Sequence, residues 1–397
     1  LWDWMQDYED KTGGDILAIA HNGNMSNGAM FQLNEHFTGE AMDREYFEVR
    51  ARWEPLYEIT QIKGDGEAHP YLSPDDEFAD YETWDKGNLT LTEAKTDDML
   101  QYEYAREGLK VGLEIEKRLG INPYKVGMIG STDTHTALAT AEEDNFYGKH
   151  SGVEPTPKRW EHPVAEIGES KIVAWEMAAS GYAGVWAHEN TREAIFDAMM
   201  RKETYATTGP RMVVRFFGGF GFTEEDAHVR NPGRLGYTKG VPMGGDIIVS
   251  EANRGRTPSF LVGALKDPLG ANLDRIQIVK GWLGADGKRQ EKIYDIVWGG
   301  DRQPGANGKL PPVGNTVDLK TATFKNSIGE SELIGVWEDP DFDPAVPAVY
   351  YARVIEIPTP RWVVYDAVRF NTKVDPKVPM ITQERAYTSP IWYTPPK

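Results

Sequence analysis

The chain has 397 residues, 40% hydrophobic and 26% charged, a balance typical of two or three globular units rather than of a disordered or fibrous protein. Its 62 acidic and 43 basic residues give a formal net charge of -19, which disfavours nucleic acid and anionic membrane surfaces as partners. Cysteine is absent, so a metal ion would need His, Asp, Glu, carbonyl or water ligands. No apolar run approaches the ~20 residues that span a bilayer.

Strand and helix patterns alternate over residues 1–209. The run DILAIA at 15–20 is short and continuously apolar, which indicates a strand buried on both faces of a parallel sheet. Further strands are expected at 54–63 and 125–130. Strands separated by helices favour an α/β barrel or a layered sheet.

One helix is predicted before the strand at 125–130, and a second helix is predicted after it. Apolar residues at helical spacing predict a helix over 97–119, which Gly120 would end. A second helix is expected over 191–203, beginning at Asn190 with Glu193 three residues later as in a capping box.

The pattern changes from residue 210 onwards. Short alternating segments separated by Gly, Pro, Asn and Asp indicate an antiparallel sandwich or barrel, so we place a domain boundary between 1–209 and 210–397. The predicted strands include RMVVRFF, SFLVGAL, RIQIVKGWL, KIYDIVW, VYYARVIEI and RWVVYDAV.

Polar residues follow two of the predicted parallel strands. His21, Asn22 and Asn24 come after the first, and Asp133 and His135 come after the third. Sites assemble at the carboxyl ends of parallel strands, and side chains two apart on extended chain share a face, so a carboxylate and an imidazole here could bind Zn²⁺, Mn²⁺ or Fe. The alternative is that these are hydrogen-bonded loop residues without a metal.

Three charged residues are further candidates. Glu58 lies among apolar neighbours on the second strand and needs a partner, either a metal ion or a structural cation such as Lys63. Lys63, in a loop that also contains Glu67, could meet an anionic substrate or could simply be solvated. Arg211 carries a planar fork suited to phosphate or carboxylate, although its segment could be only a hinge into the β-rich region.

Five stretches of the chain are distinctive when taken together: AIAHNGNMSNG, EPLYEITQIKGDGEAHP, GSTDTHTA, GVWAHENTREAIFDAMMRKETYATTGPR and QERAYTSPIWY. They resemble a bacterial family called domain of unknown function 3604. That family is similar in turn to the polymerase and histidinol phosphatase (PHP) superfamily of metal-dependent phosphoesterases.

The resemblance implies a distorted (β/α)7 PHP-like barrel, followed by or combined with the β-sandwich-like region. It implies that His21, Asp133 and His135 bind metal, with two or three ions when all ligands are present. The superfamily's opening H-x-H and D-H motifs do not occur in this chain, so we expect a further N-terminal segment, in the same or a separate chain. The resemblance also favours a periplasmic or otherwise exported bacterial protein.

These features predict a metal-dependent hydrolase of phosphate esters or related small anionic substrates. His21, Asp133 and His135 would be catalytic metal ligands, joined by Glu58. Asn22, Asn24, Lys63 and Arg211 would orient the substrate. Alternatives are a hydrolase of a sulfate ester, amide or lactone, and a non-catalytic protein that binds glycan or peptide on a degenerate barrel.

Overall fold

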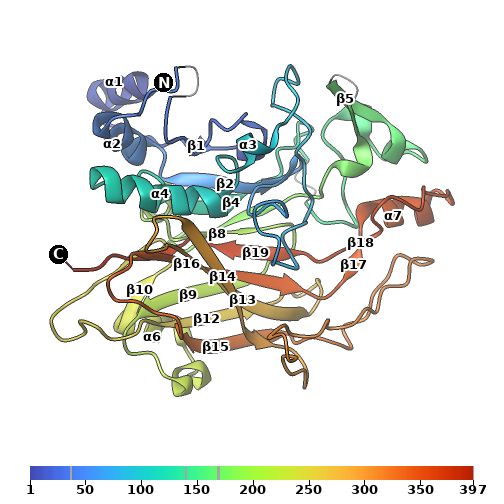
Figure 1. The fold of residues 1–397 in the computed structure, drawn as a ribbon. Helices are drawn as coiled ribbons and strands as arrows, with labels where there is room; N and C mark the ends of the chain where they lie inside the picture. Colours follow the sequence, from blue (N-terminus) through green and yellow to red (C-terminus); the bar gives the residue numbers. More distant parts are fainter. Residues whose placement is uncertain (36–37, 139–140, 168–169, 397) are drawn as a thin grey trace.

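Three layers of secondary structure stack on one another in the computed structural model, which describes residues 1–35, 38–138, 141–167 and 170–396 (Figure 1). Helices of the N-terminal part and a small sheet form the first layer, a large and mainly antiparallel sheet forms the second, and a four-stranded antiparallel sheet forms the third. The helices are α1 (Trp2–Thr12), α2 (Arg44–Trp53), α3 (Asp97–Leu100), α4 (Ala105–Leu119), α5 (Arg192–Met200), α6 (Pro232–Lys239) and α7 (Trp362–Arg369).

The small sheet contains the predicted parallel strands. Strand β2 (Leu56–Gln61) pairs in parallel with β1 (Ile19–Ala20) on one side and β4 (Gly127–Gly130) on the other. A hairpin adds β3 (Gly64–Asp65) antiparallel to β2. All three predicted strands are therefore present but shorter than expected, and the strands of this sheet that the structure describes form an open sheet, not a closed barrel.

The helix predicted over 97–119 is divided in two. Tyr104 adopts an extended conformation between α3 and α4, because the chain turns there to bury Glu103 completely. The Glu103 carboxylate accepts hydrogen bonds from the Lys95 ammonium (2.5 Å) and the Gly28 amide (3.1 Å). The end of α4 is as predicted, with Gly120 in the left-handed conformation at φ 74°.

Two antiparallel sheets confirm the expectation of β-rich structure after residue 210. The four-stranded sheet has the order β10 (Gly240–Pro242), β9 (Val213–Gly219), β12 (Ser259–Leu265), β15 (Glu332–Glu338). The eight-stranded sheet contains β11 (Asp246–Ile247), β20 (Ile391–Tyr393), β16 (Ala348–Glu356), β19 (Arg385–Thr388), β8 (Thr204–Thr207) and β7 (Tyr182–Val185). In the same sheet, β13 (Leu273–Leu283) pairs with β16, and β14 (Arg289–Trp298) pairs with β13. All its pairs are antiparallel except β11 with β20. Two small hairpins are β5 (Pro163–Ile167) with β6 (Ser170–Val173), and β17 (Thr359–Pro360) with β18 (Ile381–Thr382).

Strand β16 belongs to two hydrophobic cores at once. Tyr350 and Ala352 face the core between the two antiparallel sheets, whereas Val349 and Tyr351 face the core that contains α4 and the parallel sheet. Successive side chains of a strand point to opposite faces, so a strand in the middle layer is buried throughout its length. Its long apolar run in the sequence follows from this position.

Buried ion pairs connect the first layer to β16. Arg353 of β16 is fully buried and donates to the carboxylates of Glu67 (3.0 Å) and Asp76 (2.8 and 2.9 Å). Arg106 of α4 also contacts both carboxylates. Glu67, considered above as part of a substrate loop, therefore lies within this network.

The segment RWVVYDAV is a helix, α7, and the prediction of a strand there was wrong. Its Val and aromatic residues suggested a strand, but Trp362, Val363 and Asp366 are buried at helical spacing. The Asp366 carboxylate pairs with Arg159, which fixes the helix against the β5–β6 hairpin region. The cap of α5 also differs from the prediction, because the Thr191 side chain, not Asn190, accepts the hydrogen bond from Ala194.

Strands from both sides of residue 209 share the eight-stranded sheet. Strand β8 pairs with β19, which lies near the carboxyl end of the chain, and with β7. The Thr204 hydroxyl of β8 also donates to the Met128 carbonyl of β4 (3.0 Å), which links the two sheets.

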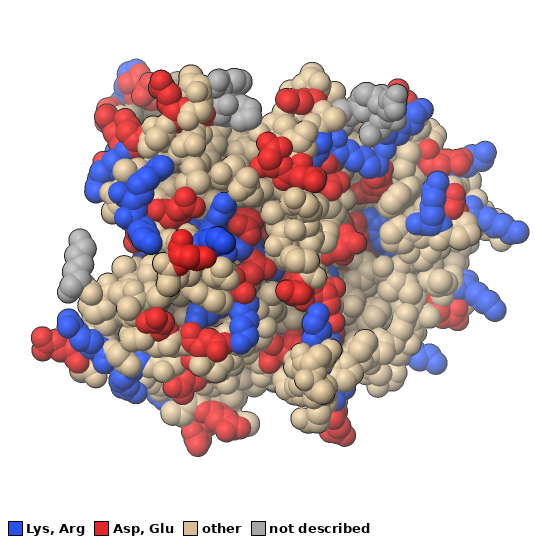
Figure 2. Space-filling model, in the orientation of Figure 1, with Lys and Arg blue, Asp and Glu red and all other residues tan. Residues whose placement is uncertain are grey.

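Acidic and basic side chains are interspersed on the molecular face in Figure 2. Many exposed charges form pairs, for example Arg44 with Glu48 and Lys292 with Asp341. Among the described residues, no helix has both the length and the apolar character needed to cross a bilayer.

Candidate functional site

Polar side chains meet at the carboxyl ends of β1, β2 and β4. Gln61, the last residue of β2, donates from Nε2 to Asn22 Oδ1 (2.7 Å) and to Asp133 Oδ2 (2.9 Å). Asn22 follows β1 and Asp133 follows β4, so one amide group joins the loops after all three parallel strands. The carboxyl edge of the sheet is thus where the predicted site residues gather.

Two lysines and a histidine surround the Asp133 carboxylate. The Lys63 ammonium contacts Oδ2. Lys149 Nζ lies 2.6 Å from both Oδ2 and the main-chain oxygen of Asp133, and 3.1 Å from Nε2 of His135. The His135 ring nitrogen is 3.3 Å from Asp133 Oδ1, and its side chain is 65% exposed. We call Gln61, Lys63, Asp133, His135 and Lys149 the Asp133 cluster.

The two ammonium groups influence each other and the imidazole. Burial, followed by the charge of Lys149, lowers the pKa of Lys63 to about 7, and the nearby carboxylate of Glu58 opposes this shift. Burial likewise lowers the pKa of Lys149. The Lys149 ammonium lowers the pKa of His135. The imidazole is therefore held in its neutral form, which can accept a proton or coordinate a metal ion.

The backbone is in the left-handed region at two of these positions. Asn22 has φ 55° and Asp133 has φ 47°. Asn and Asp tolerate this conformation better than other non-glycine residues, and such positions concentrate at functional sites. The conformation explains why Asp133 turns back toward Gln61 instead of continuing the line of β4.

Glu58 lies on β2, three residues before Gln61. The pairing of β2 with β4 shifts register between Glu58 and Thr60, a bulge of the kind found beside active sites. The Ser131 hydroxyl donates to Oε1 of Glu58, and Oε2 is buried with no hydrogen-bond partner in the part of the chain that is described. One buried oxygen is thus available to a further ligand.

The comparisons with known proteins identify a family. The model of the family described as protein of unknown function (DUF3604) matches residues 1–395. The chain belongs to this family. No curated protein and no solved structure matches this chain.

The other predicted residues of the DUF3604 protein lie around or away from the cluster. His21 precedes Asn22 and is exposed, with no hydrogen bond to any other described residue. Asn24 donates both amide hydrogens to the main-chain carbonyls of Lys63 (2.9 Å) and Trp84 (3.0 Å), so it holds the backbone of Lys63. Arg211 lies over the Tyr182 ring, 5.7 Å from its centroid. No contact between Arg211 and the Asp133 cluster is found among the described residues.

No group of three or more His, Asp or Glu side chains in the described ranges is arranged to hold a metal ion. Two residues of the cluster were missed from the sequence. Gln61 could have been found as a polar residue at a strand end, like those that were selected. Lys149 lies fourteen positions after His135 in an irregular loop and carries no local signal.

Proposed function

We propose that this protein is a metal-dependent hydrolase of phosphate esters or related anionic esters. The observation that carries the proposal is the convergence of the Lys63 and Lys149 ammonium groups at Asp133, beside the exposed imidazole of His135. Lysine ammonium groups bind phosphoryl oxygens as point charges, and a pair of them suits a dianion. Only His135 in this group has a largely exposed side chain, so it can exchange a proton with a substrate.

The chemistry of the donors at this edge fits a divalent ion such as Zn²⁺, Mn²⁺ or Fe. Asp133, the neutral imidazole of His135 and the partnerless Oε2 of Glu58 are ligands of the right type, and His21 follows the adjacent strand. A bound ion would lower the pKa of a water molecule and supply hydroxide near neutral pH. The resemblance to the PHP superfamily, with its distorted (β/α)7 barrel and two or three metals, supports this proposal.

Each residue of the site would have its own role. Lys63 and Lys149 hold the anionic group, and Gln61 and Asn22 fix the orientation of Asp133. His135 takes or gives a proton at the edge of the site. Asn24 acts on the substrate through the backbone of Lys63.

Anion binding without hydrolysis is the second candidate function. It is favoured by the contacts of both ammonium groups with Asp133, which occupy the carboxylate that a metal ion would need. In this case the protein would bind an anionic glycan or peptide and leave it unchanged.

Metal analysis and a substrate panel separate the two candidates. Purified protein is analysed for bound metal and assayed with Mn²⁺ or Zn²⁺ on chromogenic phosphate esters, sulfate esters, amides and lactones. We expect bound transition metal and phosphate-ester turnover, and we expect Lys149→Met to lower kcat/KM by about tenfold to a hundredfold.

Lys171→Met, which removes an exposed lysine paired with Glu166, is the matched control and should leave kcat/KM unchanged. Protein without bound metal that still binds phosphate tightly would contradict the hydrolase proposal and favour the second candidate. Turnover of a sulfate ester, amide or lactone alone would change the substrate class.

A further inference from the structure

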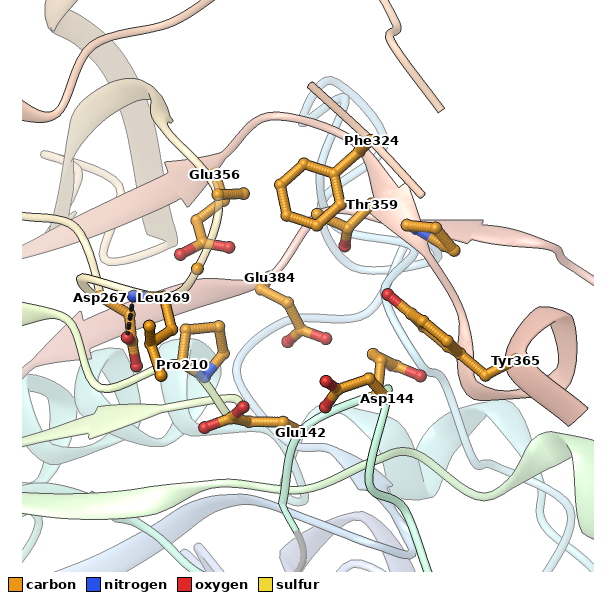
Figure 3. Close-up of a pocket in the computed structure, with 14 residues that line it drawn as sticks. Glu142, Asp144, Pro210, Asp267, Leu269, Phe324, Glu356, Thr359, Tyr365 and Glu384 are labelled. Atoms are coloured by element: carbon orange, nitrogen blue, oxygen red, sulfur yellow. Dashed lines mark hydrogen bonds between the residues drawn. The ribbon is translucent and has the colours of Figure 1, made fainter. Parts of the chain in front are cut away.

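An acidic cavity that shares no residue with the Asp133 cluster lies at the end of the eight-stranded sheet (Figure 3). Its volume is about 90 Å³. The lining comes from distant parts of the chain: Glu142–Asp144, Pro210, Asp267, 269–271, Phe324, Glu356, Thr359, Pro360, Tyr365 and Glu384. Six of these residues are carboxylates, and none of those that the structure describes is Lys or Arg.

Some of these carboxylates already have partners. Asp267 accepts hydrogen bonds from the main-chain amides of Arg211 (2.7 Å) and Leu269 (2.8 Å). Glu384 accepts from the Tyr81 hydroxyl (3.0 Å) and from the Thr208 hydroxyl. These two groups are held in place by the fold.

Glu356 and Thr359 do not have such partners. Glu356 is 1% exposed and Thr359 is 7% exposed. Oε1 of Glu356 and Oγ1 of Thr359 are buried with no hydrogen-bond partner among the described residues. Both side chains line the cavity, and Figure 3 shows the Glu356 carboxylate directed toward Glu384 and the cavity between them. Buried polar groups without partners are rare and indicate a ligand or ordered solvent.

No positively charged side chain among the described lining residues balances the carboxylates of the cavity. Burial raises the pKa of Glu356, and the nearby carboxylate of Glu384 raises it further. Lys266 opposes this shift, but its ammonium group donates to the main-chain carbonyls of Asp267 (2.8 Å) and Gly270 (2.9 Å). Burial also raises the pKa of Glu384, to about 7. A cation in the cavity would relieve this repulsion.

The lining favours an organic cation over a metal ion. Phe324, Tyr365, Leu269 and Pro360 contribute aromatic and apolar surface beside the carboxylates. Carboxylates next to aromatic rings suit an ammonium group on a short alkyl chain.

We propose that this cavity binds a small organic cation with a primary ammonium group, which donates hydrogen bonds to Glu356 and Thr359 while its alkyl part contacts Phe324 and Tyr365. The proposal is independent of the hydrolase proposal, because it concerns a different cavity and its test measures binding.

Calorimetric titration with n-propylammonium chloride tests the proposal. We expect saturable binding with a Kd on the order of 1 mM, since the ligand is very small. The isosteric change Glu356→Gln should weaken binding at least tenfold, because it removes the unpaired carboxylate. Thr359→Val should weaken binding by a smaller factor, about threefold.

Glu338→Gln is the matched control, because it removes the same charge from an exposed strand residue outside the cavity and should leave the Kd unchanged. Glu356→Gln replaces a buried carboxyl group by an amide of the same size, so a folded protein is expected, and thermal unfolding verifies this. Absence of saturable n-propylammonium binding, equal binding of n-propanol, or displacement of the amine by Mg²⁺ or Ca²⁺ would each overturn the proposal.

Affinity should increase between about pH 6 and pH 8, because the ligand binds the ionised carboxylates and must displace their protons. The same titration in two buffers of different ionisation enthalpy detects the released protons. The charged and titratable groups that face Glu356 and Glu384 are Glu82, Tyr81, Glu142, Glu143, Asp267 and Lys266.

Discussion

Among the described residues, the Asp133 carboxylate is in direct contact with the ammonium groups of both Lys63 and Lys149, which are partly buried. We expect Asp133→Asn to lower the free energy of unfolding by about 2 kcal/mol, because it leaves Lys63 and Lys149 close together without a counter-charge. Urea unfolding near neutral pH measures the change. The control is Asp7→Asn, which breaks an exposed pair with Lys11 and should change stability by about 0.5 kcal/mol or less. Equal losses in the two variants would contradict a special role for Asp133.

The ionisation of Glu384 predicts how the stability of the fold depends on pH. Burial raises its pKa to about 7 in the folded protein, with Glu82 adding to the shift and the hydroxyls of Thr208 and Tyr81 opposing it. A carboxyl group with a raised pKa favours folding at low pH, and this contribution is lost as the pH rises from about 4.5 through 7. We therefore expect Glu384→Gln to be more stable than the parent at pH 8 and to depend less on pH between 5 and 8.

Chemical denaturation at several pH values tests this expectation. Glu143 faces Glu384 and also has a raised pKa from burial, so part of the pH dependence will persist in the variant. A parent protein whose stability does not fall between pH 5 and 8 would contradict the prediction.

The sequence identified part of the candidate site because the pattern there is local. Asp133 and His135 are two residues apart after an apolar strand, and Asn22 follows another strand, so their types and positions were sufficient. Lys149 reaches Asp133 only because an irregular loop folds back over the sheet, and a short-range pattern cannot encode that path. Arg211 had suitable chemistry, but its position near Tyr182 and Asp267 depends on tertiary structure.

Helix α4 packs so closely that a methyl group has no room at one position. A Cβ atom at Gly108 would lie 2.4 Å from the Phe31 ring. Alanine favours helix over glycine by about 1 kcal/mol, but crowding in a packed core costs about 1 to 3 kcal/mol. We expect Gly108→Ala to lower the free energy of unfolding by about 1 kcal/mol or more, as measured by urea unfolding.

The second change Phe31→Leu should recover part of that loss, because it removes ring atoms from the crowded position. On the exposed side of the same helix, Lys117→Ala should be nearly neutral. A stabilised Gly108→Ala protein would mean that Phe31 moves aside at little cost, and would contradict the prediction.

Elements with a single strong period were predictable, and elements whose composition opposes their structure were not. SFLVGAL is strand β12 with the same bounds as predicted. RWVVYDAV has the Val and aromatic content of a strand, yet it forms α7 because Asp366 must reach the buried Arg159. The break between α3 and α4 likewise depends on the contacts of Glu103 with Lys95 and with Gly28, and Gly28 lies 75 residues earlier in the chain.

The layers of the molecule are held together by charge as well as by apolar contact. We expect Arg353→Met to lower the free energy of unfolding by about 3 to 5 kcal/mol, because it leaves the buried carboxylates of Glu67 and Asp76 with Arg106 as their main counter-charge. Urea unfolding followed by both tryptophan fluorescence and circular dichroism measures the loss and reports whether the layers separate.

Acid titration gives a second test of the same network. Burial alone would raise the pKa of Asp76, but Arg353 and Arg106 together hold it below the usual value. A carboxyl group with a lowered pKa stabilises the fold above its unfolded pKa, and this stability is lost as the pH falls below about 4. In Arg353→Met, the free energy of unfolding should therefore fall less steeply as the pH is lowered below about 4. Arg44→Met, at an exposed pair with Glu48, should leave this acid dependence unchanged.

The position of β16 in the middle layer makes the length of this strand unusually constrained. Successive side chains of a strand point to opposite faces of the sheet. Deleting one residue near Val349 would therefore move every later side chain of β16 to the opposite face. Tyr350 and Ala352 would then point toward α4, and the guanidinium group of Arg353 would enter the apolar interior of the sandwich. Substitutions that keep apolar volume should be tolerated along this strand, whereas insertions or deletions of a single residue should abolish folding. Natural variation in chain length is therefore expected in the loops around β16 and not within it.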